Sequence, residues 1–355
     1  MSTFVVMPPP PKTRLGRHRQ LAPLAGMHLQ ATRRVLRRGG NFIDTANNYQ
    51  DETSEQFIGE WMEQRGNRDQ MVIATKYSSN YKRGTDIPQQ THYVGNNMKS
   101  LHMSVAASLK KLRTDYIDIL YVHWWDWACG VEEVMNGLHN LVAQGKVLYL
   151  GISDTPAWIV SKANMYARMA NKTPFVIYQG AWSILERDFE REIIHMAREE
   201  GMALAPWNVL AGGKIRTDAE EERRRQTGEK GRMWFGPDWE RTEGERKVCL
   251  ALEKVAAEVG AKSITAVALA YVLQKTPNVF PLVGGRKVEH LLDNISALEI
   301  ALSEEQVKYL EDVLPFVRGF PHEMIGDGTG FGFLHAMGGP LERWPRRQAL
   351  RPTSD

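Results

Sequence analysis

The sequence predicts an α/β fold of the (β/α)8 barrel class. Short apolar runs alternate with longer amphipathic stretches along most of the 355 residues. The apolar runs are nearly unbroken in hydrophobicity, as expected of strands that are covered on both faces of a parallel sheet. We count seven strand candidates, which favours a barrel with helices outside over an open, doubly wound sheet.

The expected strands are brief and rich in Val, Ile or aromatic residues. In chain order they are residues 41–46, 71–76, 117–122, 147–151, 175–178, 202–206 and 279–283. Helical patterns occupy residues 54–64, 100–112, 131–143, 157–169, 189–200 and 246–274. Gly260 interrupts the last pattern and predicts two helices there. Gly39, Gly40, Gly145 and Gly201 lie where a helix should give way to a strand.

A closed barrel needs eight strands, and the pattern supplies seven. The missing strand should precede all the others, because the weak pattern at residues 30–38 indicates the end of a first helix. An open barrel would expose the edges of the first and last expected strands. Residues 21–29 are the segment available to cover them, although Pro23 makes this segment a poor strand.

The composition is that of an ordinary globular protein, with 43% hydrophobic and 25% charged residues. A net charge of +3 gives no indication of a nucleic-acid or membrane-surface partner. Cys129 and Cys249 are too few for a disulfide framework and fit a reducing compartment. No apolar run reaches the roughly 18 residues of a membrane span, and the Pro-rich start lacks the features of a signal peptide. We therefore expect a cytoplasmic protein with a small-molecule partner, whose oligomeric state the sequence leaves open.

One barrel domain is expected over residues 1–325, with a flexible N-terminus at 1–13. A highly charged loop, residues 214–246, is either a surface insertion or a lid, since functional loops in barrels follow strand ends. Residues 326–355 form a tail rich in Gly and Pro. Its GDGTGFG run matches a dinucleotide fingerprint only superficially, because no strand precedes it and no helix follows.

Four titratable side chains lie at or just after the carboxyl ends of three expected strands, where barrel enzymes carry their catalytic groups. They are Asp44, Tyr49, Lys76 and His123. Taken singly, each has an ordinary explanation: a turn or helix cap, a half-buried loop aromatic, a solvated lysine and a core histidine. One shared site explains all four positions at once.

Together these residues have the parts of a proton donor. A Tyr hydroxyl with a pKa of about 10 is a poor acid at neutral pH, and a neighbouring ammonium lowers its pKa. Burial of Lys76 requires a carboxylate partner, which Asp44 supplies. His123 is placed to hydrogen-bond a carbonyl oxygen or Tyr49 and so to direct the proton.

The segments that carry these residues resemble the aldo-keto reductase family. NFIDTANNY (41–49) is similar to that family's Asp and Tyr motif, IATKY (73–77) to its Lys strand, and YVHWWD (121–126) to its His strand. The resemblance spans roughly residues 13–325. It is strongest to the fungal branch of aryl-alcohol dehydrogenase and norsolorinic acid reductase type, which includes enzymes of secondary-metabolite clusters.

This resemblance implies an NADPH-dependent reductase of aldehydes or ketones, or alcohol dehydrogenase, in fungal polyketide or terpenoid biosynthesis. Tyr49 would be the general acid, Lys76 and Asp44 would tune it, and His123 would orient the substrate. Trp124 beside it would contact an aromatic or polycyclic substrate, although plain packing explains this tryptophan equally well. No Cys and His cluster has ligand spacing, so we expect no metal.

The resemblance also implies the cofactor contacts. Ser153, Asp154 and Gln179 match the residues that hold the nicotinamide carboxamide, and Trp182 matches the aromatic that stacks on its ring. The segment PWNVLAGGK (206–214) follows a strand and contains adjacent glycines, whose backbone permits close approach to a pyrophosphate, although an ordinary tight turn has the same pattern.

Two cations, Arg286 and Lys287, open the helix after the last strand and suit a 2′-phosphate, which favours NADP over NAD; solvated surface charges are the alternative. His290 and Asn294 lie four residues apart and match the family's adenosine contacts. The complete predicted cofactor set is Asp44, Ser153, Asp154, Gln179, Trp182, Asn208, Val209, Leu210, Ala211, Gly212, Gly213, Lys214, Gly285, Arg286, Lys287, His290 and Asn294.

The sequence departs from the family at its start. Residues 14–29 resemble the opening β-hairpin, but the chain then passes directly to residues 30–42, which resemble the end of the first helix. About 30 residues, one βα unit, are absent, in agreement with the count of seven strands. A second hypothesis is therefore a catalytically impaired NADPH-binding protein. A third uses Lys76 as a Schiff-base lysine, as in an aldolase.

Overall fold

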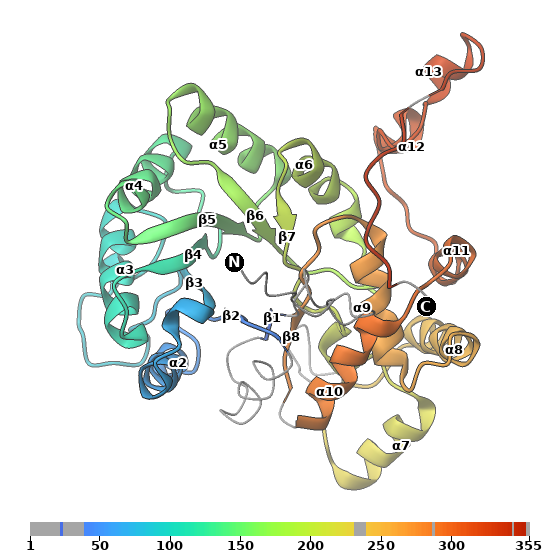
Figure 1. Cartoon of the computed structure of the whole chain (residues 1–355), viewed down its shortest axis with the longest axis horizontal. Coiled ribbons are helices and arrows are strands. Elements are labelled where there is room, and N and C mark those ends of the chain that lie inside the picture. The colour runs from blue at the N-terminus through green and yellow to red at the C-terminus, as the bar shows by residue number, and fades with distance from the viewer. Residues whose placement is uncertain (1–21, 24–38, 231–238, 286–287, 343, 353–355) are drawn as a thin grey trace, which may run out of the picture.

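The computed structural model describes residues 22–23, 39–230, 239–285, 288–342 and 344–352. Within them, six strands form one parallel sheet whose spatial order is the chain order (Figure 1). They are β2 (Phe42–Asp44), β3 (Val72–Tyr77), β4 (Ile117–Val122), β5 (Val147–Ser153), β6 (Phe175–Gln179) and β7 (Ala203–Leu204). Sequential parallel strands joined by helices are the arrangement of a (β/α) barrel, so the predicted fold class is confirmed.

Helices follow the strands in turn and surround the sheet (Figure 1). The α-helices are α2 (Thr53–Arg65), α3 (Met98–Leu112), α4 (Val131–Ala143), α5 (Ala157–Met169), α6 (Ile193–Glu199), α7 (Asp218–Thr227), α8 (Glu243–Glu258), α9 (Ile264–Lys275), α10 (Val288–Ser296), α11 (Glu304–Asp312), α12 (His322–Ile325) and α13 (Phe333–Ala336). The 3-10 turns are η2 (Arg68–Gln70), η3 (Thr91–Tyr93), η4 (Asp188–Glu190), η5 (Ala211–Gly213) and η6 (Ala297–Glu299).

The expected elements agree with the observed ones most closely in the middle of the chain. Strand β4 and helices α4 and α5 have the predicted bounds. The long helical pattern splits into α8 and α9 around Gly260, whose φ of +66° ends the first helix. The last two expected strands are shorter than predicted, because regular ladder pairing is confined to Ala203–Leu204 in the first and to Leu282–Val283 in the second.

The predicted helix over residues 189–200 is wrong in its first half. This stretch begins as the 3-10 turn η4, and α6 starts only at Ile193. The reason is the core beside it. Phe189 stacks on Trp182 with ring centroids 5.3 Å apart, and Glu190 accepts a hydrogen bond of 3.2 Å from the Trp182 indole. A regular helix would not turn both of these neighbouring side chains into the core.

The sheet continues past β7 to a short strand, β8 (Leu282–Val283). The Phe280 N–H donates to Leu204 at 2.7 Å, and the Leu282 N–H donates to Pro206 at 2.8 Å. Strand β8 pairs in parallel with β1 (Ala22–Pro23). Residues 22–23 therefore occupy the place of the strand that the sequence lacks, and the segment expected to cover the open edge does so over two residues. The rest of residues 21–29 lies outside the described residues.

Alternation along the strands places one set of small and apolar side chains inside the barrel. This inner layer contains Phe42, Ala74, Tyr121, Ile177, Ala205 and Leu282, all buried. Gly151 opposes Tyr121 across β4 and β5, and a Cβ at this glycine would lie 2.5 Å from the Tyr121 ring. The residue two positions further along each strand faces the same way. That rule places Asp44, Lys76, Ser153 and Gln179 in one polar layer above the apolar one.

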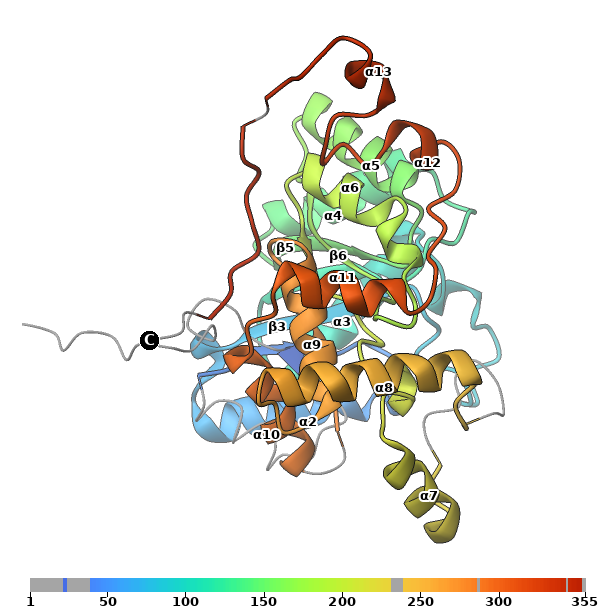
Figure 2. The same cartoon turned by 90° about the vertical axis from the view of Figure 1, so that its right-hand side faces the viewer.

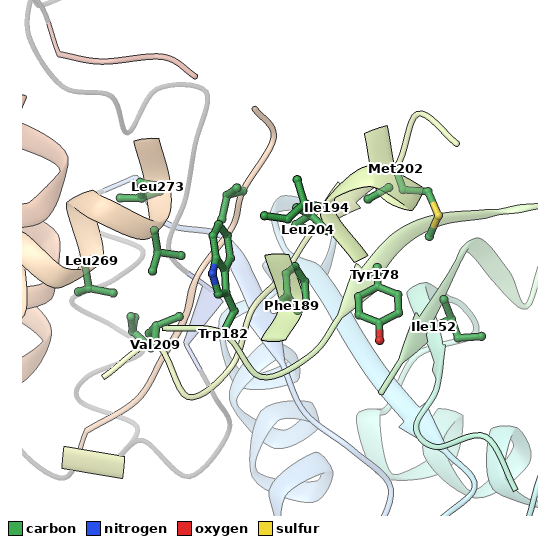
Figure 3. Packing of buried hydrophobic residues seen from close by; sticks show 14 of the residues in the cluster. Ile152, Tyr178, Trp182, Phe189, Ile194, Met202, Leu204, Val209, Leu269 and Leu273 are labelled. Carbon is green, nitrogen blue, oxygen red and sulfur yellow. The ribbon is translucent and has the colours of Figure 1, made fainter. Parts of the chain in front are cut away.

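The outer faces of the strands pack against the helices. Helix α9 is buried along nearly its whole length and supplies Leu269 and Leu273 to this core. Figure 3 shows these leucines beside Trp182, which is itself next to Phe189. The helix-facing core and the apolar inner layer together hold each strand in place from both faces of the sheet. The polar side chains at the strand ends are therefore positioned by apolar packing.

Residues 214–246 contain an element that the sequence did not predict, helix α7. It projects from the body of the molecule in both views (Figures 1 and 2). Ion pairs hold its start: Arg216, only 1% exposed, pairs with Glu221, and Arg241 pairs with Glu221 and Asp218. Charge pairing rather than an apolar face therefore attaches this segment. Residues 231–238 lie outside the described residues, so its role as an insertion or a lid stays a prediction.

Among the described residues, no helix is long and apolar enough to cross a membrane. Beyond α11, the chain forms an arm that carries the one-turn helices α12 and α13 and extends beside α6 (Figure 2). This arm corresponds to the predicted tail and begins a few residues before it.

We expect Gly151→Ala to lower the free energy of unfolding by about 1–3 kcal/mol, because the added methyl group has no space beside Tyr121. Urea denaturation of the variant measures this effect. Gly330→Ala is the matched control, since no heavy atom lies within 4 Å of a Cβ built at Gly330. Equal stability of both variants would contradict the inner-layer packing described above.

Candidate functional site

The centre of the polar layer is an ion pair between Lys76 and Asp44. Both side chains are fully buried. The Lys76 ammonium donates to Asp44 Oδ2 and, at 2.8 Å, to the carbonyl oxygen of Thr45. The other carboxylate oxygen, Asp44 Oδ1, accepts a 2.9 Å hydrogen bond from the Gln179 amide. Burial lowers the pKa of Lys76, but attraction to Asp44 and Tyr49 outweighs burial and raises it, so the ammonium keeps its proton.

Tyr49 lies on the loop after β2, directly above this pair. The Lys76 ammonium is 5.1 Å from the centroid of the Tyr49 ring. The loop continues through three non-glycine residues in the left-handed region, Gln50, Asp51 and Glu52, with φ of 51°, 50° and 73°. Such conformations cost free energy and persist where the surroundings enforce them, often at functional sites.

The expectation that Lys76 lowers the pKa of Tyr49 is only half right. Burial raises the pKa of Tyr49 above 10, Lys76 opposes this rise, and Asp44 adds to it. The effect of burial is larger than that of Lys76, so the phenol is fully protonated at neutral pH. The ammonium therefore acts by limiting the rise in the pKa rather than by bringing it below its ordinary value.

His123 follows β4 and faces Tyr49 edge to face, with ring centroids 5.8 Å apart. Its other neighbour is Trp124, which stacks on it at 5.3 Å. Burial, followed by repulsion from Lys76, holds the pKa of His123 well below its ordinary value of 6.5. The imidazole is therefore neutral. The structure thus brings together all four residues that the sequence proposed as a proton donor.

Asp154 ends β5 in a left-handed conformation, with φ of 48°. Its carboxylate accepts hydrogen bonds from the Ser153 hydroxyl at 2.5 Å and the Trp207 indole at 3.1 Å. Its backbone N–H donates to the Gln179 carbonyl at 2.9 Å. Burial raises the pKa of Asp154 to about 6, against the effect of its hydrogen bonds to Ser153 and Trp207. Ser153, Asp154 and Gln179 therefore form one polar group at the ends of β5 and β6.

The predicted position of Trp182 beside the nicotinamide does not fit its surroundings. Trp182 is 0% exposed, and one face of its ring stacks on Phe189. Figure 3 shows it among core side chains. The partly exposed indole next to Asp154 is that of Trp207, which was not among the predicted cofactor residues. A signal was available, because Ala205 faces the barrel interior and the residue two positions later keeps that face.

The loop after β7 has an unusual run of backbone conformations. Asn208, Ala211, Gly212 and Gly213 all have positive φ, between 48° and 92°. Successive N–H groups in such conformations form concave anion-binding surfaces. The side chain of Val209 is buried at 3% exposure, so only its backbone is available to a ligand.

Three side chains of this loop are engaged within the protein. Asn208 donates to Glu186 at 3.0 Å, and the Lys214 ammonium pairs with Glu245 at 2.9 Å. Leu210 packs against the main hydrophobic core. The predicted phosphate contact by Lys214 would therefore compete with Glu245.

The second predicted cofactor segment lies around β8 and α10. Gly285 packs closely on His290, since a Cβ at this glycine would lie 3.0 Å from the His290 Cβ. His290 is exposed, whereas Asn294 one turn later is buried. Arg286 and Lys287 lie outside the described residues, and their predicted role at a 2′-phosphate stays a prediction.

A pocket of about 510 Å³ reaches Ser79 and Trp124, the two residues that contact the His123 ring. It is lined by Asn48, Asp51, Ser78, Ser79, Asn80, Tyr81, Arg83, Val94, Gly95, Trp124 and Asp126. Trp124, the predicted substrate contact, lies on its wall. The other wall residues were not predicted as site residues from the sequence, because they come from loops without hydrophobic periodicity.

Comparison with known proteins gives one consistent result. The model of the Aldo/keto reductase family matches residues 27–315. An aryl-alcohol dehydrogenase (NADP(+)) of Phanerodontia chrysosporium is 61% identical, over 97% of this chain and 98% of the relative. Norsolorinic acid reductase B of Dothistroma septosporum is 50% identical, over 89% of this chain and 82% of the relative's length. The aldo-keto reductase ausK of Emericella nidulans is 46% identical, over 90% and 86% respectively.

The alignment with the Phanerodontia protein runs over 376 positions, more than the 355 residues of this chain. The relative therefore contains residues that this chain lacks, in agreement with the predicted absence of a βα unit.

Replacing Asp154 with Asn should stabilise the protein above pH 6 and have little effect near pH 4. An acid whose pKa rises on folding, here from 3.8 to about 6, contributes stability below pH 3.8 and loses it as the pH rises through 6. The amide has no charge to bury, so we expect a gain of about 2 kcal/mol at pH 8. Urea denaturation from pH 4 to 8 measures it. Asp86→Asn, at an exposed loop position, is the control, and a pH-independent difference for Asp154→Asn would contradict the prediction.

Proposed function

The chain belongs to the aldo/keto reductase family, and we propose that it is an NADPH-dependent oxidoreductase that reduces an aromatic or polycyclic aldehyde or ketone to the alcohol. The observation that carries the proposal is the buried Lys76–Asp44 pair beneath a protonated Tyr49 and beside a neutral His123. This group has one acid, one charge that stabilises its conjugate base, and one neutral hydrogen-bonding ring.

The residues around this group fit a nicotinamide dinucleotide. NADPH supplies a hydride to the carbonyl carbon when it is bound. Gln179 has its amide nitrogen committed to Asp44, so its carbonyl oxygen is the atom that would accept from a carboxamide NH2. The partly exposed ring of Trp207 offers a surface for stacking, and the adjacent glycines Gly212 and Gly213 allow phosphates to approach the backbone closely.

Proton transfer follows from the arrangement of Tyr49, Lys76 and His123. In reduction, the Tyr49 hydroxyl donates its proton to the carbonyl oxygen as the carbon receives the hydride. The phenolate that remains lies beside the Lys76 ammonium, which offsets its charge until a proton from solvent restores the phenol. His123, held neutral, hydrogen-bonds the substrate oxygen and fixes its direction relative to Tyr49.

The two other hypotheses are less well supported. An impaired NADPH-binding protein would keep the motifs as well, and the enzyme names of the relatives favour a working reductase over it. A Schiff-base lysine must lose its proton and reach a substrate carbonyl. Lys76 is 1% exposed and its ammonium is bonded to Asp44 and Thr45, so its chemistry favours a fixed positive charge.

The pocket supports an aromatic substrate. The rings of Tyr81 and Trp124 line it, and Trp124 also stacks on His123. One relative is named for an aryl alcohol and another for norsolorinic acid, and on that basis we extend the proposal to secondary-metabolite biosynthesis. A cytoplasmic location is also part of the proposal, supported by the free thiols of Cys129 and Cys249.

Tyr49→Phe should lower kcat for reduction of an aryl aldehyde by roughly a hundred- to ten-thousandfold, the usual size of a general-acid contribution. NADPH affinity, measured by quenching of tryptophan fluorescence, should stay within about twofold of the original value, because the hydroxyl is not among the proposed cofactor contacts. Tyr309→Phe, on the exposed face of α11, is the control. Undiminished turnover in Tyr49→Phe would refute the proposed acid, and a protein that binds no NADPH would refute the proposed function.

The two tryptophans should respond differently to substitution. Trp207→Leu should weaken NADPH binding about tenfold, because a stacking surface is lost. Trp182→Phe should instead lower the free energy of unfolding and leave NADPH affinity unchanged, since Trp182 is part of the core. Titration with NADPH and urea denaturation of both variants separate these effects. If Trp182→Phe weakens NADPH binding and Trp207→Leu does not, Trp182 is the residue that stacks on the nicotinamide ring, as the sequence predicted.

A further inference from the structure

Two serines follow β3 immediately after the catalytic lysine strand. Ser78 is buried and has a φ of +108°, a conformation that side chains other than glycine rarely adopt. Ser79, next to it, places its hydroxyl oxygen 3.3 Å from Nδ1 of His123. A strained residue persists only where its surroundings enforce it, so the position of the Ser79 hydroxyl is determined by the contacts around Ser78.

Those contacts converge on Asn96, which is 0% exposed. Its amide nitrogen donates to Ser78 Oγ and to the Trp124 carbonyl, both at 2.8 Å. Its amide oxygen accepts from the Asp126 N–H at 2.9 Å, and its own N–H donates to the Asp126 carboxylate at 2.7 Å. The Tyr77 hydroxyl donates to the backbone carbonyl oxygen of Asn96 at 3.3 Å. Asn96 thus joins the loop after β3 to the loop after β4, on either side of His123.

A neutral imidazole has one nitrogen that donates and one that accepts, and a neighbouring group decides which is which. In the described residues, the partner of His123 Nδ1 is the Ser79 hydroxyl. A hydroxyl can rotate to donate or to accept. An incoming carbonyl oxygen is an acceptor only, so a productive complex needs the hydrogen on Nε2 and therefore a donor at Nδ1.

We propose that Ser79 is a positioning residue that donates its hydroxyl proton to Nδ1 of His123, fixes the Nε2–H tautomer and so makes the ring a hydrogen-bond donor to the substrate oxygen. Asn96 holds Ser79 in place through the two loops. The role toward substrate rests on the proposed function, whereas the tautomer is a property of the protein alone.

The tautomer is read directly from 15N NMR spectra of the full-length protein with labelled histidines, because the two ring nitrogens differ in chemical shift and in their couplings to ring protons. His123→Asn identifies the His123 signals. We expect the Nε2–H pattern in the unsubstituted protein, a shift toward a mixture of tautomers in Ser79→Ala, and return of the original pattern in Ser79→Thr, which keeps the hydroxyl.

The chain offers a matched control. His139 on α4 makes the same kind of contact, with its Nδ1 3.0 Å from the Thr173 hydroxyl oxygen. Thr173→Ala should alter the His139 signals and leave both the His123 pattern and turnover unchanged. Asn96→Ala removes several buried hydrogen bonds at once and endangers folding, so Ser79→Ala is the decisive variant.

Ser79→Ala should also lower kcat for aldehyde reduction about tenfold, the size expected from the loss of one hydrogen bond. The KM for NADPH should not change, because Ser79 contacts no proposed cofactor residue, and Ser79→Thr should recover most of the loss. An Nδ1–H pattern in the unsubstituted protein, or an unchanged pattern in Ser79→Ala, would overturn the proposal. So would a changed pattern with unchanged kcat. If no carbonyl compound is reduced by the unsubstituted protein while Ser79→Ala still changes the tautomer, the proposed function fails and the assignment of the tautomer stands.

Discussion

The buried ion pair between Lys76 and Asp44 is the constraint on which the rest of the site depends. Two charges removed from water cost several kcal/mol each unless hydrogen bonds satisfy every remaining donor and acceptor. Here the Thr45 carbonyl accepts a second hydrogen bond from Lys76, and the Gln179 amide donates one to Asp44. Asp44 is on β2, Lys76 on β3 and Gln179 on β6, so the ion pair and its hydrogen bond to Gln179 join strands that are not all neighbours in the sheet. The Lys76 ammonium lowers the pKa of both Tyr49 and His123. For Tyr49 this opposes the effect of burial, and for His123 it adds to the effect of burial.

Sequence reasoning predicted the parts of the site that lie on strands. Asp44 and Lys76 were predicted from their places at the ends of strands, and Gln179 from the resemblance to the family. The period of two along each strand brings all three to the same face of the sheet. The loop residues were less predictable. Three successive left-handed residues, Gln50 to Glu52, carry Tyr49 over the ion pair, and no pattern in their side chains predicts that conformation. Trp182 was assigned to the cofactor because its motif matches, yet a motif in a loop does not tell a ring that faces the core from one that faces the site.

The missing βα unit leaves the barrel open beside β2, the strand that carries Asp44. The described sheet runs without interruption from β2 to β7, and the polar layer draws its residues from β2, β3, β5 and β6. The seam lies between β8 and β2, where Ala22 and Pro23 are the described residues that pair with β8. Pro23 has no N–H to donate, which limits what this strand can add to the ladder. The cost of the deletion therefore falls first on the closure of the barrel, between the cofactor segment after β8 and the strand that carries Asp44.

The electrostatics of the site favour reduction over oxidation at neutral pH. Before the reaction the group holds a protonated Tyr49, a neutral His123 and one ammonium that Asp44 balances. Proton donation to a carbonyl oxygen creates a single new charge, the phenolate, and places it beside the ammonium. Oxidation of an alcohol must begin from that phenolate, and burial keeps its population low until the pH is raised. We therefore expect this site to reduce carbonyl compounds at neutral pH and to oxidise alcohols faster as the pH is raised.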